Sequence, residues 1–196
     1  MNLPNKLTVL RMILVPFFVF FLLVPGIPHH YLIALLIFAG ASYTDHLDGK
    51  IARSRGLITN FGKLMDPLAD KILVISALVC MVELGLTSAW FVIIIIAREF
   101  LVTSIRLLAV ENGRVIPANN WGKAKTVSQM VAILTVLGMQ YVLELNRMHV
   151  FTVEDPLVLS TCFWLVGNVL IAIAVVLTLI SGVTYLMQNI ELFSDK

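Results

Sequence analysis

Long apolar stretches separated by short polar segments constrain the fold of this chain most strongly. The stretches are residues 12–25, 31–52, 61–86, 89–110, 121–143 and 157–187. A helix needs about 20 mostly apolar residues to cross a bilayer, and the first stretch reaches that length when residues 7–10 are added. Of the 196 residues, 59% are hydrophobic and 13% are charged, which is unlike a soluble domain. The sequence therefore predicts an all-α integral membrane bundle of six transmembrane helices.

The remaining segments complete this expected architecture. Residues 1–11 mix leucine and valine with Asn5, Lys6 and Arg11, which is typical of a short interfacial segment on the membrane surface. We expect the first apolar stretch to be retained as a span, because no small-residue cleavage site follows it. Cys80 and Cys162 each lie in an apolar run and are expected to be packing residues. With no internal repeat, residues 1–196 are expected to form a single membrane domain.

The distribution of basic residues predicts the orientation. With both termini in the cytoplasm, nearly all lysines and arginines lie on or near the inner side, and Arg147 alone lies on the outer side. This asymmetry follows the positive-inside rule and places the segment between the second and third spans at the cytoplasmic face. The net charge of +2 gives no reason to expect nucleic acid as a partner.

Two pairs of aspartates interrupt these apolar stretches. Asp45 and Asp48 are separated by three positions, and Asp66 and Asp70 by four, so each pair shares one face if its segment is helical. A carboxylate at the centre of a membrane span costs roughly 2.5 to 3.5 kcal/mol of insertion free energy, so such residues mark functional sites. Clustered carboxylates repel one another, and divalent cations relieve that repulsion. The second stretch crosses the membrane only if its helix continues through the first pair.

Written as a pattern, this region is D-x2-D-G-x2-A-R-x8-G-x3-D-x3-D. The fixed positions are Asp45, Asp48, Gly49, Ala52, Arg53, Gly62, Asp66 and Asp70. All of them match the signature of the CDP-alcohol phosphatidyltransferase family, which this sequence resembles. The segments NLPNKLTVLR, NFGKLMDPLADK, IAREF and WGKAKT look like its bacterial branch that makes phosphatidylglycerophosphate, so the resemblance covers nearly the whole chain.

The resemblance implies a fold, substrates and a location. The fold is six transmembrane helices in a homodimer, set in a bacterial cell membrane with membrane lipids around it. The substrates are CDP-diacylglycerol and sn-glycerol 3-phosphate, and the products are phosphatidylglycerophosphate and CMP. The implied activity is that of a metal-dependent transferase in anionic phospholipid biosynthesis.

The signature residues have expected roles. Transfer from a pyrophosphate needs its oxygens neutralised, and one or two Mg²⁺ or Mn²⁺ ions held by Asp45, Asp48 and Asp66 would do this. The family assigns Asp70 as the general base, and it is also a candidate ligand of a second metal. Asp48, Gly49, Ala52, Arg53 and Gly62 are the expected CDP-binding residues. Their glycines admit the nucleotide, and the arginine supplies a planar cation for the pyrophosphate.

The phosphate of the acceptor needs a separate basic pocket. Arg98 and Arg106 come from the fourth span and Lys123 from the start of the fifth, and the resemblance assigns these positions to glycerol phosphate binding. Arg98 lies near the middle of the bilayer, so it must face a partner or a polar cavity. We expect Glu99 to be a structural partner of an arginine. Solvated charges at the inner rim are expected at Arg55, Arg114 and Lys125.

Alternatives remain open from the sequence. Inositol phosphate, or phosphatidylglycerol as in cardiolipin synthesis, is another possible acceptor within the same family. A prenyltransferase also uses aspartate pairs and Mg²⁺, but its motifs normally lie on distant helices. A divalent-cation transporter would place its acids near the bilayer midplane, whereas these lie toward one face. His46 and Lys50 occupy variable positions within the signature where the branch often has aromatic residues, so packing or lipid contact there is expected to differ.

Overall fold

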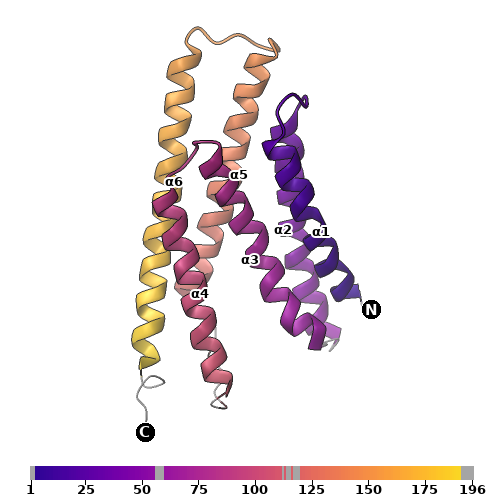
Figure 1. Cartoon of the computed structure of the whole chain (residues 1–196), viewed down its shortest axis with the longest axis vertical. Helices are drawn as coiled ribbons and strands as arrows, with labels where there is room; N and C mark the ends of the chain where they lie inside the picture. The colour runs from indigo at the N-terminus through magenta and orange to yellow at the C-terminus, as the bar shows by residue number, and fades with distance from the viewer. Residues whose placement is uncertain (1–2, 56–59, 112, 114–115, 117–119, 191–196) are drawn as a thin grey trace.

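A computed structural model describes residues 3–55, 60–111, 113, 116 and 120–190, with the backbone alone for residues 3–4, 45–55, 60–64, 66–67, 70 and 111. The helices are α1 (Leu3–Leu23), α2 (His30–Arg55), α3 (Asn60–Glu83), α4 (Ala89–Glu111), α5 (Asn120–Arg147) and α6 (Pro156–Gln188). No strand occurs within these ranges. The prediction of an all-α bundle is therefore confirmed, and Figure 1 shows the helices running roughly along one common direction.

Three of these helices are long and apolar enough to cross a membrane on length and composition alone. They are Asn5–Leu23, Asn120–Arg147 and Pro156–Gln188, and the apolar part of α2 is a shorter segment, His30–Thr44. In α4, Arg98, Glu99 and Arg106 interrupt the apolar run, and much of the signature segment of α2 and α3 lies outside the residues whose side chains are described. Six helices match the six predicted stretches, while the number that crosses the bilayer remains a prediction.

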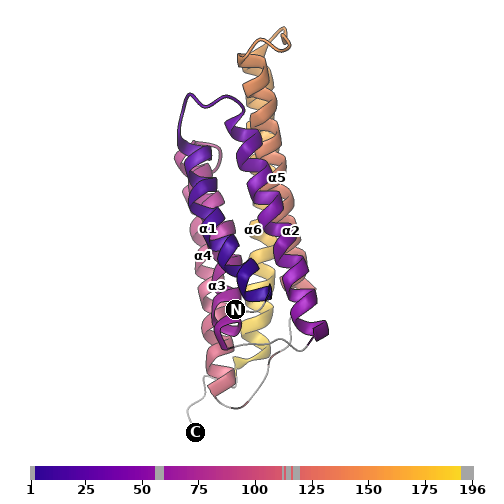
Figure 2. The same cartoon turned by 90° about the vertical axis from the view of Figure 1, so that its right-hand side faces the viewer.

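Each helix packs against at least two others. The two longest, α5 and α6, lie side by side, α1 packs against both α2 and α3, and α4 packs against α6. Contacts of α2 with α5 and of α3 with α4 join these groups (Figures 1 and 2). The apolar core includes Phe18 and Phe38, whose ring centroids are 5.8 Å apart, together with Met81, Ile133 and Ile171.

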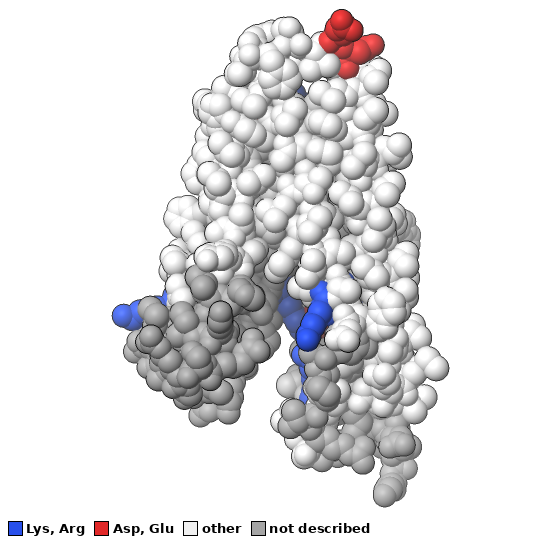
Figure 3. All heavy atoms as spheres, turned by 180° about the vertical axis from the view of Figure 1, so that it is seen from behind, with Lys and Arg blue, Asp and Glu red and all other residues white. Residues whose placement is uncertain are grey.

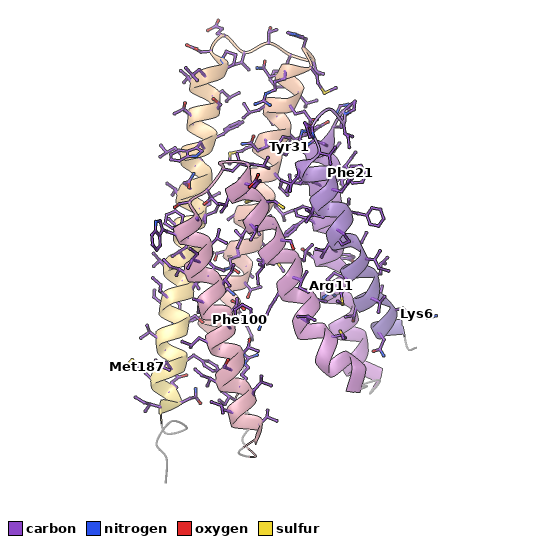
Figure 4. All side chains as sticks on the ribbon, viewed as in Figure 1. Lys6, Arg11, Phe21, Tyr31, Phe100 and Met187 are labelled. Atoms are coloured by element: carbon purple, nitrogen blue, oxygen red, sulfur yellow. The ribbon has the colours of Figure 1, made fainter. Side chains whose placement is uncertain are left out.

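The N-terminal residues differ from the expected interfacial segment, because they form the first turns of α1. Asn5, Thr8 and Arg11 are buried and continue in register with Val15, Phe18 and Leu22 along one face of the helix. Spacings of three and four residues keep these side chains on one stripe, which packs into the bundle. Figure 4 shows Arg11 on the lower half of α1, beside α3. The polar residues are thus covered by neighbouring helices, which a surface segment would not be.

Several contacts join the helices at the end of the bundle where α2 begins and α5 finishes. Glu144 of α5 is buried and accepts hydrogen bonds from the backbone N–H groups of His30 (3.0 Å) and Tyr31 (3.3 Å) at the start of α2. This contact explains why α5 continues one turn past the expected end at Leu143. Trp164 of α6 donates to the carbonyl oxygen of Gly85 at 3.2 Å, and Gly85 adopts a φ of +68° in the turn after α3.

Candidate active site

The signature pattern spans the facing ends of two helices. Asp45, Asp48, Gly49, Ala52 and Arg53 lie in the last turns of α2, and Gly62, Asp66 and Asp70 lie in the first turns of α3. The backbone of both segments is helical, so each aspartate pair shares one face of its helix, as predicted. The side chains of these signature residues, and those of His46 and Lys50, lie outside the part that the structure describes. The expected metal and CDP contacts therefore remain predictions.

The other functional candidates lie at the same end of the molecule. We call this the motif end: the end where α2 finishes and α3 begins. Figure 1 shows that α4 and α6 also finish there and that α5 begins there. The space-filling view shows a hollow opening at this end, with Lys and Arg atoms beside it (Figure 3). The fold thus brings the signature helices and the predicted acceptor-binding helices to one place.

A buried group of charged and polar side chains joins α4, α5 and α6 near the motif end. Glu99 forms ion pairs with Arg98, where the nearest N···O distance is 3.3 Å, and with Lys125 of α5. Arg98 also donates a hydrogen bond of 2.5 Å to the Ser181 hydroxyl of α6. The side chains of Arg98, Glu99 and Lys125 are only 11%, 15% and 5% exposed, respectively. The expected pairing of Glu99 with an arginine is confirmed.

A second chain of contacts connects this group to α3. Lys71, the residue after Asp70, donates a hydrogen bond to the Thr103 hydroxyl of α4. That hydroxyl in turn donates to the backbone carbonyl of Glu99 at 2.6 Å. Lys71 also lies close enough to Glu99 to interact with its charge. We name Lys71, Arg98, Glu99, Thr103, Lys125 and Ser181 the Glu99 cluster, and it begins one residue beyond the signature.

Two glycines let the Glu99 cluster pack closely. A Cβ added at Gly182 would lie 3.0 Å from Cγ of Arg98, so the arginine stem rests directly against the backbone of α6. A Cβ added at Gly122 would lie 3.7 Å from the Ser181 hydroxyl oxygen and 3.8 Å from a terminal nitrogen of Arg98. Larger side chains at Gly182 would displace Arg98 from its contact with Ser181.

The second predicted arginine also contacts α6. Arg106 Nε donates to the Tyr185 hydroxyl at 3.1 Å, and its guanidinium lies 5.7 Å from the centre of that ring. Tyr185 is buried, whereas Arg106 is exposed. Because eight residues correspond to about 12 Å along a helix, Arg98 and Arg106 bind α6 at two separate levels.

The third predicted cation, Lys123, is placed differently. Its side chain is exposed and forms no hydrogen bond or ion pair with the residues whose side chains the structure describes. Lys125, expected to be a solvated charge at the rim, is instead buried in the Glu99 cluster, so that expectation was wrong. Two residues turn a helix by about 200°, so these lysines point to nearly opposite sides of α5.

The sequence contains a pattern that indicates the burial of Lys125. It is in helical phase with the buried residues Gln129, Ala132 and Val136 of α5, which marks the inner face of that helix. One turn further along α5, Gln129 makes another polar contact with α6, since its amide lies 3.5 Å from the Thr178 hydroxyl.

A recess elsewhere in the bundle is not part of this site. It has a volume of about 290 Å³ and lies between α5 and α6, lined among others by Gln140, Arg147 and Trp164. Gln140 is about 22 Å along α5 from Lys125, at 1.5 Å per residue. The recess therefore belongs to the far end of the bundle.

An all-helical apolar bundle with this signature at one end defines a class of membrane transferases. The chain belongs to the CDP-alcohol phosphatidyltransferase family, whose model matches residues 1–180. A similar protein from Bacillus subtilis (strain 168), named CDP-diacylglycerol--glycerol-3-phosphate 3-phosphatidyltransferase, is 39% identical over 97% of this chain and 96% of its own length. A protein of the same name from Rickettsia bellii (strain RML369-C) is 33% identical over 94% of this chain and 93% of its own length. The Escherichia coli (strain K12) protein of that name is 42% identical over 69% of this chain and 76% of its own length.

Proposed function

We propose that this protein transfers the phosphatidyl group of CDP-diacylglycerol to sn-glycerol 3-phosphate, releasing CMP. The observation that carries the proposal is the meeting of two features at the motif end: the signature on α2 and α3, and the largely buried cations Arg98 of α4 and Lys125 of α5. The first suits a nucleotide pyrophosphate, and the second suits a phosphate-bearing acceptor. The relatives' names agree with both substrates.

The signature residues fit a divalent cation by the chemistry of their donors. Four carboxylates on two helix ends offer only hard oxygen ligands, which Mg²⁺ and Mn²⁺ prefer. We assign Asp45, Asp48 and Asp66 as ligands of one or two such ions, with Asp70 a further candidate. Among the residues whose side chains are described, no group of three or more His, Cys, Asp or Glu is placed to hold a metal. When bound, the metal supplies Lewis-acid neutralisation of the pyrophosphate oxygens.

The chain's own residues then perform the remaining steps. The hydroxyl oxygen of the acceptor forms a bond to the phosphorus that carries diacylglycerol, and the bond from that phosphorus to the CMP oxygen breaks. Asp70 takes the proton of the attacking hydroxyl as general base. Arg53 binds the pyrophosphate, while Asp48, Gly49, Ala52 and Gly62 accommodate the cytidine nucleotide. Arg98 and Arg106, with Lys123 at the rim, bind the phosphate of glycerol 3-phosphate.

We further propose a location and an assembly. Apolar helices and the family make this a membrane protein. The bacterial relatives and the basic residues near the motif end support a plasma-membrane enzyme with that end and both termini in the cytoplasm. The homodimer implied by the resemblance remains a prediction, which cross-linking of the purified protein would test.

The deciding experiment measures CMP release from CDP-diacylglycerol by the purified full-length protein. We expect release with glycerol 3-phosphate, its loss when divalent cations are chelated, and its recovery on adding Mg²⁺ or Mn²⁺. Inositol phosphate and phosphatidylglycerol serve as competing acceptors in parallel reactions. Release with one of these and none with glycerol 3-phosphate would overturn the choice of acceptor. Metal flux in vesicles without phosphatidyl transfer would favour a cation transporter.

A further inference from the structure

Glu99 occupies an unusual position among the cations of the motif end. Within the described residues, it is the carboxylate that binds both Arg98 and Lys125, and it also interacts with the charge of Lys71. One negative charge therefore faces three positive ones inside the bundle. The proposed reaction assigns Glu99 no direct contact with substrate, so its role is open.

Lys125 depends on Glu99 to remain where it is. An ammonium group that is 5% exposed loses most of its hydration, and the charge is tolerated only if a counter-charge and hydrogen bonds replace the water. Glu99 supplies both. Without this partner, Lys125 would turn toward water or lose its proton, and either change would remove an oriented cation from the site.

The cations of the cluster retain donors for a further anion. An ammonium group has three N–H donors, and the contact with Glu99 uses one of those on Lys125. Arg98 uses one terminal nitrogen for Glu99 and the other for Ser181, while its buried Nε donates to none of the described residues. A phosphate monoester, with two negative charges and three terminal oxygens, matches this surplus of charge and donors.

We propose that Glu99 is a positioning residue, whose largely buried carboxylate holds Arg98 and Lys125 in the orientation that binds the phosphate of the acceptor. This inference rests on the proposed function, because it concerns the acceptor side of that same site. It adds the buried Lys125 to the exposed Lys123 among the lysines that bind the acceptor phosphate, and it makes the orientation of Lys125 depend on Glu99.

The geometry favours positioning over competition between Glu99 and the bound phosphate. The backbone of Glu99 is itself tied to α3 through Thr103 and Lys71, so its carboxylate is anchored at the junction of three helices. Because Arg98 and Lys125 have N–H donors that no described residue accepts, we expect a phosphate to bind beside Glu99 and not in its place. Loss of the carboxylate charge should therefore weaken acceptor binding.

The test compares Glu99→Gln with the full-length wild-type protein in mixed micelles. Loss of one charge-assisted contact corresponds to roughly a tenfold effect or more, so we expect the KM for glycerol 3-phosphate to rise at least about tenfold. We expect the KM for CDP-diacylglycerol to stay within about twofold. Glu99→Asp, which keeps the charge, should recover part of the loss.

Glu144→Gln is the matched control, because it neutralises another buried carboxylate at the far end of the bundle. We expect it to lower thermal stability and leave both KM values unchanged. A merely structural role for Glu99 predicts this same pattern in Glu99→Gln. Such a pattern, equal rises in both KM values, or a fall in the KM for glycerol 3-phosphate would each overturn the proposal.

A double variant tests the link to Lys125 even if Glu99→Gln alone folds poorly. In Glu99→Gln/Lys125→Met the buried pair is replaced as a unit, which spares the fold an unpaired charge. If Glu99 acts through Lys125, the double variant should have about the same KM for glycerol 3-phosphate as Lys125→Met. Effects that multiply independently would contradict this. If the wild type is active and Glu99→Gln leaves the KM for glycerol 3-phosphate unchanged, this inference alone fails. If the wild type is inactive with glycerol 3-phosphate, the proposed function fails as well.

Discussion

At the scale of single residues, a substitution of Asp70 should distinguish the chemical step from substrate binding. In the proposed reaction its carboxylate takes a proton, while the other signature residues hold the donor. We predict that Asp70→Asn lowers kcat about 100-fold or more, since positioned general bases contribute about that factor. CDP-diacylglycerol binding, measured by titration of the purified variant, should be largely retained. Wild-type turnover in Asp70→Asn would remove this residue from the base role.

Arg106 offers a second test at this scale, because its contact with α6 is defined. We predict that Arg106→Ala raises the KM for glycerol 3-phosphate about tenfold, the equivalent of about 1.4 kcal/mol, and leaves the KM for CDP-diacylglycerol nearly unchanged. Tyr185→Phe removes the hydroxyl partner at 3.1 Å but keeps the ring beneath the guanidinium. It should therefore have a smaller effect than Arg106→Ala. Equal increases for the two substrates would contradict a role in acceptor binding and would favour the alternative that Arg106 anchors the protein to anionic lipid headgroups of the inner leaflet.

The candidate site could be predicted from the sequence only in part. The signature spacing predicted two helical aspartate pairs, and the backbone of α2 and α3 confirms that geometry. The partners of Arg98 could not be predicted in full, because Ser181 lies 83 positions away and meets it only through packing of α4 on α6. Lys125 was misplaced because charge alone suggested exposure, whereas the phase of its helix indicated burial.

At the scale of helices, α2 begins against a buried carboxylate from another helix. Glu144 accepts hydrogen bonds from the N–H groups of His30 and Tyr31, where the positive end of the helix dipole also favours an anion. We predict that Glu144→Gln lowers stability by about 1 to 2 kcal/mol, seen as a lower unfolding temperature in detergent. Glu83→Gln, at an exposed position near the end of α3, is the control and should have little effect. Equal stability in the two variants would show that the cap contributes nothing.

Helix positions were the most predictable aspect of the fold. The long apolar runs predicted α4 and α6 to within a residue or two at each end, because hydrophobic length and turn residues act locally. Tertiary contacts account for the changed boundaries of α5 and α1. Burial of Glu144 extends α5, and burial of Asn5, Thr8 and Arg11 draws the N-terminal residues into α1. Such contacts depend on which helices become neighbours, which no single segment encodes.

At the scale of the whole molecule, the proposed orientation is open to direct measurement. In a background of Cys80→Ala and Cys162→Ala, we predict that Val150→Cys reacts with a membrane-impermeant thiol reagent on intact spheroplasts. Val150 is 63% exposed in the connection between α5 and α6. Lys6→Cys, at the other end of the bundle, should react only after permeabilisation. The opposite pattern would invert the orientation.

The burial of the Glu99 cluster has a consequence for the fate of CDP-diacylglycerol. Water is present at a far higher concentration than any acceptor, and its attack on the same phosphorus would waste the activated lipid by hydrolysis. If the acceptor phosphate binds among side chains that are only 5% to 15% exposed, as proposed, its hydroxyl would be held at the phosphorus ahead of water. The burial of the acceptor phosphate would then favour transfer to the acceptor over hydrolysis of CDP-diacylglycerol.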